Sequence, residues 1–127
     1  AFRWLTQVSQ IHTVEIGESV GYSRAWLAKR RSKVATLPVG YADGVNRSLG
    51  NGVGSVYIKG LKAKIIGSVC MDMCMIDITD LAVEEGDEVV IFENQEQLLD
   101  LCSDLDTIPY ELLATISERV KRVYMEE

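Results

Sequence analysis

The sequence has 127 residues, 47% of them hydrophobic, which is enough to form the core of one globular domain of common size. Its formal net charge of -6 argues against a nucleic-acid surface, and no apolar run approaches the ~20 residues that span a bilayer. Three cysteines do not form a disulfide framework, so we expect the reducing environment of the cytoplasm.

The first half of the chain predicts short strands separated by turns. Residues 2–15 alternate loosely between apolar and polar side chains, which predicts a strand with a possible bulge. A second strand is predicted over residues 34–39, with Pro38 indicating an edge or an end, and residues 40–44 form the following turn. Residues 46–54 then read as a polar loop rich in glycine.

The middle of the chain continues the strand pattern. Residues 55–58 and 61–66 predict two short strands joined by Lys59-Gly60, a tight hairpin signal. Residues 69–78 are rich in sulfur and predict an extended segment, and residues 88–92 predict another strand.

The end of the chain predicts helices. Asn94 is a plausible N-cap for a helix over residues 95–101, and Thr107 for a second helix that has Pro109 near its start. Residues 119–124 predict a closing strand. The expected fold class is therefore mainly β, a small barrel-like or sandwich domain with two short helices near the C-terminus.

Residues 17–26 present a tyrosine with little local shielding. Tyr22 lies between Gly21 and Ser23, so the phenol could reach a partner, and glycine lets the backbone approach another surface closely. The alternative for Tyr22 is an ordinary surface or core tyrosine with a satisfied hydroxyl.

Other clusters favour structural roles. Cys70 and Cys74 would share one face of a strand, and core packing is the simpler interpretation because a metal site needs further ligands and His12 is the only histidine. The basic run 29–33 is typical of a solvated turn. The glycines of residues 50–54 lack the context of a phosphate-binding loop.

Four motifs in register resemble the C-terminal domain of alanine racemase along nearly the whole chain. They are Gly-Glu-Ser-Val-Gly-Tyr at 17–22, Leu-Pro-Val-Gly-Tyr-Ala-Asp-Gly at 37–44, Gly-Ser-Val-Cys-Met-Asp-Met-Cys-Met-Ile-Asp at 67–77 and Pro-Tyr-Glu at 109–111. Four motifs in one order are far more specific than any one of them.

The resemblance implies that residues 1–127 are one domain of a cytoplasmic isomerase that interconverts L- and D-alanine for peptidoglycan. Such enzymes also have an N-terminal barrel, absent here, with pyridoxal phosphate bound to a lysine, and they form homodimers. Because the sequence does not begin with Met, we expect Ala1 to follow a cut inside a longer chain. The chain alone should be inactive, and neither nucleic acid nor membrane is expected as a partner.

The resemblance also implies roles for individual residues. Tyr22 matches the catalytic tyrosine, which acts on the Cα proton of L-alanine in the partner subunit's site. Tyr110 matches a tyrosine that hydrogen-bonds the cofactor phosphate within its own subunit. Met71 and Asp72 match a pair that reaches the partner subunit's site, with Met71 beside the substrate. Tyr41 matches a tyrosine at the entrance of the active site, and Ile108 a residue of the entry corridor.

The sequence departs from the family pattern at Ser68, where the family often has Arg, so the family's charge at the entrance is not carried over to this chain. Two alternatives stay open. One is the β domain of another barrel-type pyridoxal-phosphate enzyme, such as a broader racemase or an amino-acid decarboxylase, for which Cys70 would be the catalytic candidate. The other is a non-catalytic β-barrel interaction module, in which the Tyr22 hydroxyl has no role.

Overall fold

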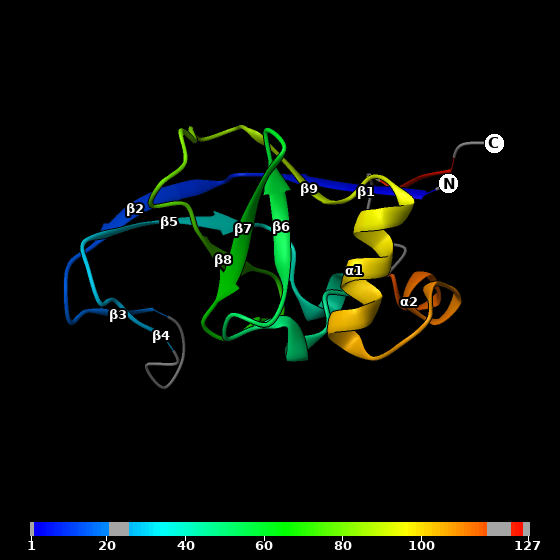
Figure 1. The fold of residues 1–127 in the computed structure, drawn as a ribbon. Coiled ribbons are helices and arrows are strands. Elements are labelled where there is room, and N and C mark those ends of the chain that lie inside the picture. The colour runs from blue at the N-terminus through cyan, green and yellow to red at the C-terminus, as the bar shows by residue number, and fades with distance from the viewer. Residues whose placement is uncertain (1, 21–25, 117–122, 126–127) are drawn as a thin grey trace.

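The computed structural model describes residues 2–20, 26–116 and 123–125, and in this part of the chain eight strands form one curled sheet with two helices beside it (Figure 1). Its order is β10-β1-β9-β6-β7-β8-β5-β2, and β3 and β4 form a separate hairpin. The bounds are β1 Phe2–Gln7, β2 Gln10–Val14, β3 Ser19–Val20, β4 Trp26–Leu27, β5 Ser32–Leu37, β6 Ser55–Ile58, β7 Leu61–Ile66, β8 Cys74–Asp77, β9 Glu88–Phe92 and β10 Val123–Met125. The expectation of a mainly β, barrel-like domain is confirmed.

The sheet curls because β1 and β2, which are consecutive in the chain, pair with strands at its two different ends. β1 pairs with β9 and β10, whereas β2, which follows after two residues, pairs with β5. At the junction Val8 N–H donates to Asp87 O at 2.9 Å and Ser9 N–H donates to Thr36 O at 3.0 Å. The single bulged strand predicted over residues 2–15 is therefore two strands, with a further register shift between Trp4 and Leu5.

The hairpin β6–β7 and strand β9 have the predicted bounds. Lys59 and Gly60 have φ values of 52° and 79°, the positive pair that a type I′ turn requires. The extended segment predicted over residues 69–78 is wrong in its first half, because β8 covers only Cys74–Asp77. Residues 70–73 turn back on themselves instead, and Cys70 N–H donates to Met73 O at 2.9 Å.

The two predicted helices are present with altered ends. In α1 (Gln95–Leu105) the Asn94 side chain accepts a hydrogen bond from Gln97 N–H at 2.8 Å, which confirms this N-cap. The helix α2 (Pro109–Thr115) begins one residue later than predicted, with Ile108 rather than Thr107 at its N-cap. Pro109 holds the preceding residue in an extended conformation, and the Thr107 hydroxyl bonds the Glu111 carboxylate at 2.6 Å.

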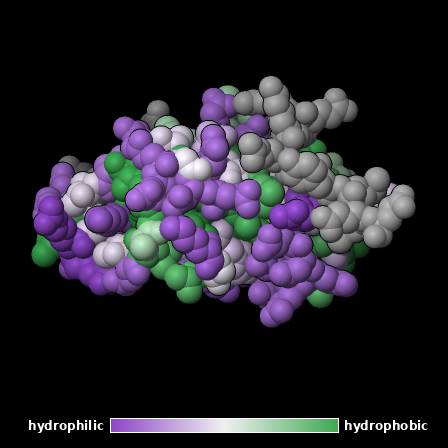
Figure 2. Space-filling model, turned by 90° about the horizontal axis from the view of Figure 1, so that it is seen from above, coloured by the Kyte–Doolittle hydropathy of each residue, from purple (hydrophilic) through white to green (hydrophobic). Residues whose placement is uncertain are grey.

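The core lies between the curled sheet and the two helices. Trp4 and Phe92 pack edge to face with ring centroids 6.3 Å apart, and Leu101 of α1 and Leu112 of α2 join the same cluster. A cavity of about 10 Å³ among these side chains is too small for a ligand. On the face shown in Figure 2, hydrophilic residues surround small hydrophobic patches.

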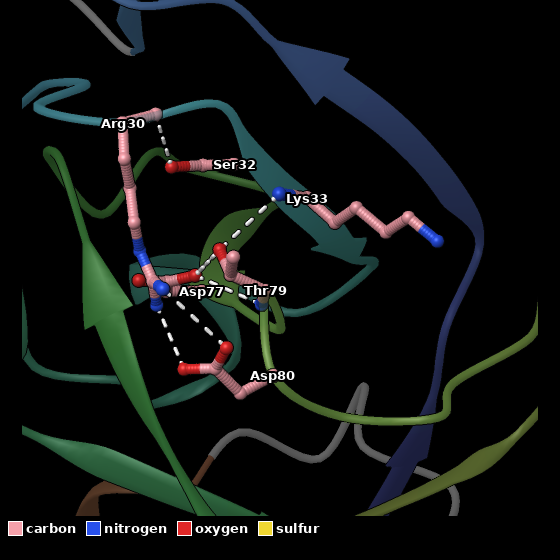
Figure 3. A network of polar contacts seen from close by, with 6 residues as sticks. All are labelled: Arg30, Ser32, Lys33, Asp77, Thr79 and Asp80. Atoms are coloured by element: carbon pink, nitrogen blue, oxygen red, sulfur yellow. Dashed lines mark hydrogen bonds and ion pairs between the residues drawn. The ribbon is translucent and has the colours of Figure 1, made fainter.

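Ion pairs and hydrogen bonds tie the turn before β5 to the residues after β8 (Figure 3). Arg30 pairs with Asp80 at 2.7 Å, and Lys33 N–H donates to the Thr79 hydroxyl at 3.2 Å. Arg31 pairs with Glu15 at 3.1 Å, and all of these charged side chains are more than half exposed. The predicted solvated basic turn is confirmed, and such exposed pairs contribute little stability.

Candidate functional site

The predicted catalytic residue, Tyr22, lies outside the described residues. The described chain reaches Val20 at the end of β3 and resumes at Trp26 at the start of β4, and these two residues are paired across the hairpin. Val20 is buried in a small apolar cluster with Val14, Ala28 and others, which fixes the base of the hairpin on the sheet. Tyr22 therefore stays a prediction from sequence, placed in the segment that joins two anchored strands.

Tyr41 begins a 3₁₀ turn (Tyr41–Asp43) that follows the end of β5 after three residues, and Tyr41 is 42% exposed. The turn is closed by Gly44 N–H donating to Tyr41 O at 3.2 Å and Val45 N–H donating to Gly40 O at 3.1 Å. The Arg47 guanidinium lies 5.6 Å from the centre of the Tyr41 ring, within the range of a cation–π contact. The positive charge of Arg47 therefore lies beside the exposed Tyr41 side chain.

The turn of Tyr41 is joined directly to the loop that carries Met71 and Asp72. Tyr41 N–H donates to Cys70 O and Ala42 N–H donates to Met71 O, both at 3.0 Å. Met71 is 53% exposed, and Asp72 is also exposed. The structure therefore brings together three of the residues that the resemblance assigned to the substrate site.

Glycine is required where these two segments touch. A Cβ atom on Gly40 would lie 2.2 Å from Cys70 O and 2.5 Å from Met71 O, far inside normal contact distance. Gly40 has φ -144°, an extended value open to any residue, so the requirement comes from the close approach and not from its conformation.

The helix α2 carries Ile108 and Tyr110 at its start, with exposed fractions of 58% and 83%. Its other end packs against the Tyr41 turn, because a Cβ atom on Gly44 would lie 2.8 Å from both Thr115 O and Ile116 Cα. Gly44 also has φ 114°, where side chains are disfavoured. The tyrosine turn, the Met71 loop and α2 are thus one packed unit.

Two adjoining grooves follow this contact. One of about 330 Å³ lies between the Tyr41 turn and the end of α2, lined by Tyr41, Gly44, Val45, Asn46, Arg47 and Thr115. The other, of about 300 Å³, continues along α2 past Asn46 and Thr115 to Thr107 and Glu111. Together they form an open wall of the candidate site, lined by both polar and apolar residues.

The sulfur groups near the site differ sharply in environment. Cys74 is buried on β8, and burial, with a smaller effect of the neighbouring Cys70, raises the pKa of its thiol to about 12. Cys74 is therefore a neutral core residue, as predicted for this pair. Cys70 is half-buried in the loop, with its Sγ atom 3.8 Å from Ser68 O, so the expectation that both cysteines share one strand face is wrong.

Sequence reasoning missed two residues of this unit. Asp43 is 7% exposed, and its carboxylate accepts a hydrogen bond from Gly40 N–H at 3.0 Å. The spacing of Gly40 and Asp43 by three residues is typical of a side chain that closes a turn, a signal that was available. Arg47 lies six residues beyond Tyr41, and no local pattern indicates that it reaches the ring.

The structure also separates two groups of predicted residues. Figure 1 shows the hairpin β3–β4, which flanks Tyr22 in sequence, at the left and the helix α2, which carries Tyr110, at the right, with strands β6, β7 and β8 between them. Among the described residues, no group of three His, Cys, Asp or Glu side chains is placed to hold a metal ion. None of the described helices is long and apolar enough to cross a membrane.

A protein-family model described as "Alanine racemase, C-terminal domain" matches residues 1–124. Among curated proteins, the alanine racemase of Cutibacterium acnes is 42% identical over 98% of this chain, which corresponds to 34% of the relative's length. The chain thus spans about a third of the curated relatives that it matches.

Solved structures give the same result. Alanine racemase from Bartonella henselae with covalently bound pyridoxal phosphate superposes with a TM-score of 0.88 at 37% identity, covering 95% of this chain and 34% of that one. Biosynthetic alanine racemase from Pseudomonas aeruginosa has a TM-score of 0.89 at 33% identity, covering 98% and 35%.

Proposed function

The chain belongs to the alanine racemase family, in which it is a C-terminal domain, and we propose that it forms the mainly β part of a pyridoxal-phosphate-dependent alanine racemase. The match of the family model to residues 1–124 carries this proposal. The packing of the Tyr41 turn against the Met71–Asp72 loop supports it, because residues 30 positions apart converge where the resemblance requires them.

We propose that the rest of the enzyme supplies an N-terminal barrel with the cofactor lysine. The chain spans about a third of its relatives, which leaves room for such a domain. A lysine that carries a carbonyl cofactor is usually desolvated, which favours its neutral form. The five lysines among the described residues are all exposed, which is consistent with a cofactor lysine elsewhere; they are Lys29, Lys33, Lys59, Lys62 and Lys64.

The residues of this chain fit contact with a phosphorylated cofactor at one point. Tyr110 is the most exposed of the large hydrophobic residues described, so its phenol is open to a group held by another domain. A phenol hydroxyl is a neutral donor suited to a phosphate oxygen. When bound, pyridoxal phosphate would supply the electron sink that stabilises negative charge at the substrate Cα.

Racemisation needs a proton removed from one face of Cα and returned to the other. We assign Tyr22 to the face from which L-alanine loses its proton, opposite the barrel lysine. A free tyrosine has a pKa of about 10, so it needs nearby positive charge or a hydrogen-bond network to act as a base at neutral pH. In this proposal that network belongs to the partner subunit's barrel.

The other assigned residues shape the approach to the reacting atoms. Met71 and Asp72 reach the partner subunit's site, with Met71 beside the substrate, and Tyr41 and Ile108 line the entrance. The cation–π contact with Arg47 favours one orientation of the Tyr41 ring. Where the family often has Arg, this chain has the neutral, half-buried Ser68. Arg47, which lies beside Tyr41, places a positive charge in the groove between the Tyr41 turn and α2.

The separation of β3–β4 from α2 favours a homodimer with shared sites. If Tyr110 serves the cofactor of its own subunit, we assign Tyr22, which lies between β3 and β4 in the sequence, to the partner's site. We place such an enzyme in the cytoplasm, supplying D-alanine for peptidoglycan.

The test is Tyr22→Phe in the full-length enzyme. The change removes one oxygen and keeps the ring, so dimer formation and cofactor content should not change. Racemisation should fall about 10²- to 10⁴-fold, the typical cost of losing positioned acid–base help. Exchange of the Cα proton of D-alanine with solvent deuterium should persist better than that of L-alanine.

Two controls accompany the test. Cys70→Ala should keep racemising, whereas a decarboxylase with a catalytic cysteine at this position would lose its activity. Mixing Tyr22→Phe with a barrel-lysine variant should form heterodimers with one whole site and restore up to half of the activity per dimer. Near-normal rates of Tyr22→Phe in both directions would return Tyr22 to the role of a surface tyrosine.

A further inference from the structure

Asp43 is a buried carboxylate at the centre of the packed unit, and the proposed chemistry gives it no role. Its side chain is directed at the backbone of its own turn, where Gly40 N–H donates to Asp43 Oδ2 at 3.0 Å. In return Asp43 N–H donates to Gly40 O at 3.0 Å. The two bonds close a ring between residues 40 and 43 and fix the path of the chain between them.

Two of the residues inside this ring hold the neighbouring loop. The N–H groups of Tyr41 and Ala42 donate to Cys70 O and Met71 O. The direction of those two N–H groups follows from the conformation that Asp43 closes. The position of the Met71–Asp72 segment relative to Tyr41 therefore depends on the Asp43 carboxylate.

We propose that Asp43 is a positioning residue that sets the distance between Tyr41 and the Met71–Asp72 segment, and so the fit of alanine at the entrance and beside Cα. This inference rests on the proposed function and deepens it. A buried acceptor that bonds a backbone N–H in a tight turn is costly to remove, because the N–H is left unsatisfied. The consequence here is a shifted loop rather than a lost reacting group.

The chain offers a matched control at Asp87. Glu84 N–H donates to Asp87 Oδ2 at 2.9 Å, and Asp87 N–H donates to Glu84 O at 3.1 Å, which repeats the ring of residues 40–43. This second ring lies at the turn end of the β6–β7 hairpin, where Lys59 reaches Asp87 at 3.4 Å. The other end of that hairpin adjoins the candidate site.

The experiment compares Asp43→Ala, Asp43→Asn and Asp87→Ala in the full-length enzyme. Hydrogen exchange by mass spectrometry of a peptide that covers residues 38–45 reads the protection of the backbone amides of this turn, including those of Tyr41 and Ala42. We expect Asp43→Ala to speed this exchange about tenfold, since the opening of local structure sets the exchange rate. Asp87→Ala should leave this peptide unchanged.

The kinetic arm separates positioning from general instability. Asp43→Ala should raise KM for alanine about tenfold with a much smaller change in kcat, because misplacement of binding groups is costly while Tyr22 and the lysine are untouched. General instability would lower the amount of active enzyme and leave KM alone. Asp43→Asn keeps an acceptor oxygen in place and should recover most of both effects.

Unchanged exchange and KM in Asp43→Ala overturn the inference, and so does an Asn variant that behaves like Ala. If Asp43→Ala does not accumulate as folded enzyme, Asp43→Gln, which moves the acceptor by one methylene, takes its place with the same expected results. Absence of racemase activity in the wild-type enzyme would refute the proposed function instead. The exchange comparison would then still decide whether Asp43 holds the two segments together.

Discussion

Gly40→Ala tests the contact on which the candidate site is built. The new Cβ atom would lie 2.2 Å from Cys70 O, and atoms of this kind are essentially never closer than 3.0 Å. The two segments must therefore separate. The hydrogen bonds from Tyr41 N–H and Ala42 N–H, now 3.0 Å, would stretch beyond the ~3.2 Å limit of normal geometry.

The cost follows from these changes. Two net hydrogen bonds contribute about 1 kcal/mol each, and forced separation of packed atoms adds about 1 kcal/mol or more. We expect Gly40→Ala to lower the free energy of unfolding by about 3 kcal/mol, or the Tm by about 10 °C for a domain of this size. No conformational penalty enters, because Gly40 already has an extended φ of -144°.

Gly52→Ala is the matched control. Gly52 has φ 85° with no atom within 4 Å of an added Cβ, so alanine there meets conformational strain without a clash. That strain costs about 1 kcal/mol. Guanidinium denaturation of the 127-residue chain, followed by circular dichroism, measures both. If Gly40→Ala destabilises no more than Gly52→Ala, the two segments are not held in the contact described above.

Three shorter predictions test other parts of the site and fold. Tyr110→Phe in the full-length enzyme should weaken cofactor retention several-fold, because it removes one neutral hydrogen bond of ~1 kcal/mol. The rate at saturating cofactor should change little. An unchanged affinity in a cofactor titration would contradict this prediction. Iodoacetamide at neutral pH should label half-buried Cys70 before Cys74, because burial keeps the Cys74 thiol protonated. Mass spectrometry would show the order of labelling. The hydrogen bond from the Glu84 N–H, with a smaller effect of Lys59, lowers the pKa of Asp87. The charged carboxylate therefore stabilises the fold at pH values above about 4, its pKa in the unfolded chain, and this stabilisation is lost as the pH falls through the lower pKa of the folded state. The difference in the free energy of unfolding between wild type and Asp87→Asn should therefore shrink in acid.

Much of the fold could be predicted because its signals are local. The Lys59-Gly60 pair sets a hairpin turn by backbone conformation alone, and Asn94 caps α1 with its own side chain. The sequence pattern ends α1 at residue 101, four residues before its observed end at Leu105. Cys102, Ser103 and Asp104 have low helical preference, and the burial of Cys102 in the core holds this last turn.

The loop over residues 67–73 could not be predicted in this way. Its run of Val, Cys and Met resembles a buried strand, yet the carbonyl groups of Cys70 and Met71 accept from Tyr41 and Ala42. These partners lie about 30 residues earlier, and no local pattern records that pairing. The resemblance placed Tyr41 and Met71 in one site, but only the structure shows the backbone contact between their segments.

The 127-residue chain alone should hold no covalent pyridoxal phosphate. The five described lysines are exposed on strands and turns, where Lys59 bonds Ala82 O at 2.9 Å and Lys64 bonds Gly52 O at 3.1 Å. Exposed lysines lack the apolar pocket and fixed neighbours that activate a cofactor lysine, so any attachment should be slow, sub-stoichiometric and spread over several lysines.

Borohydride reduction followed by peptide mass spectrometry measures this attachment, with the full-length enzyme as the positive control. That enzyme should show stoichiometric modification of one lysine outside residues 1–127. The whole chain is covered by the measurement, including Lys121, which lies outside the described residues. Stoichiometric modification of a single lysine in the isolated chain would refute the assignment of the cofactor lysine to another domain, because a dedicated cofactor site would then exist within this one.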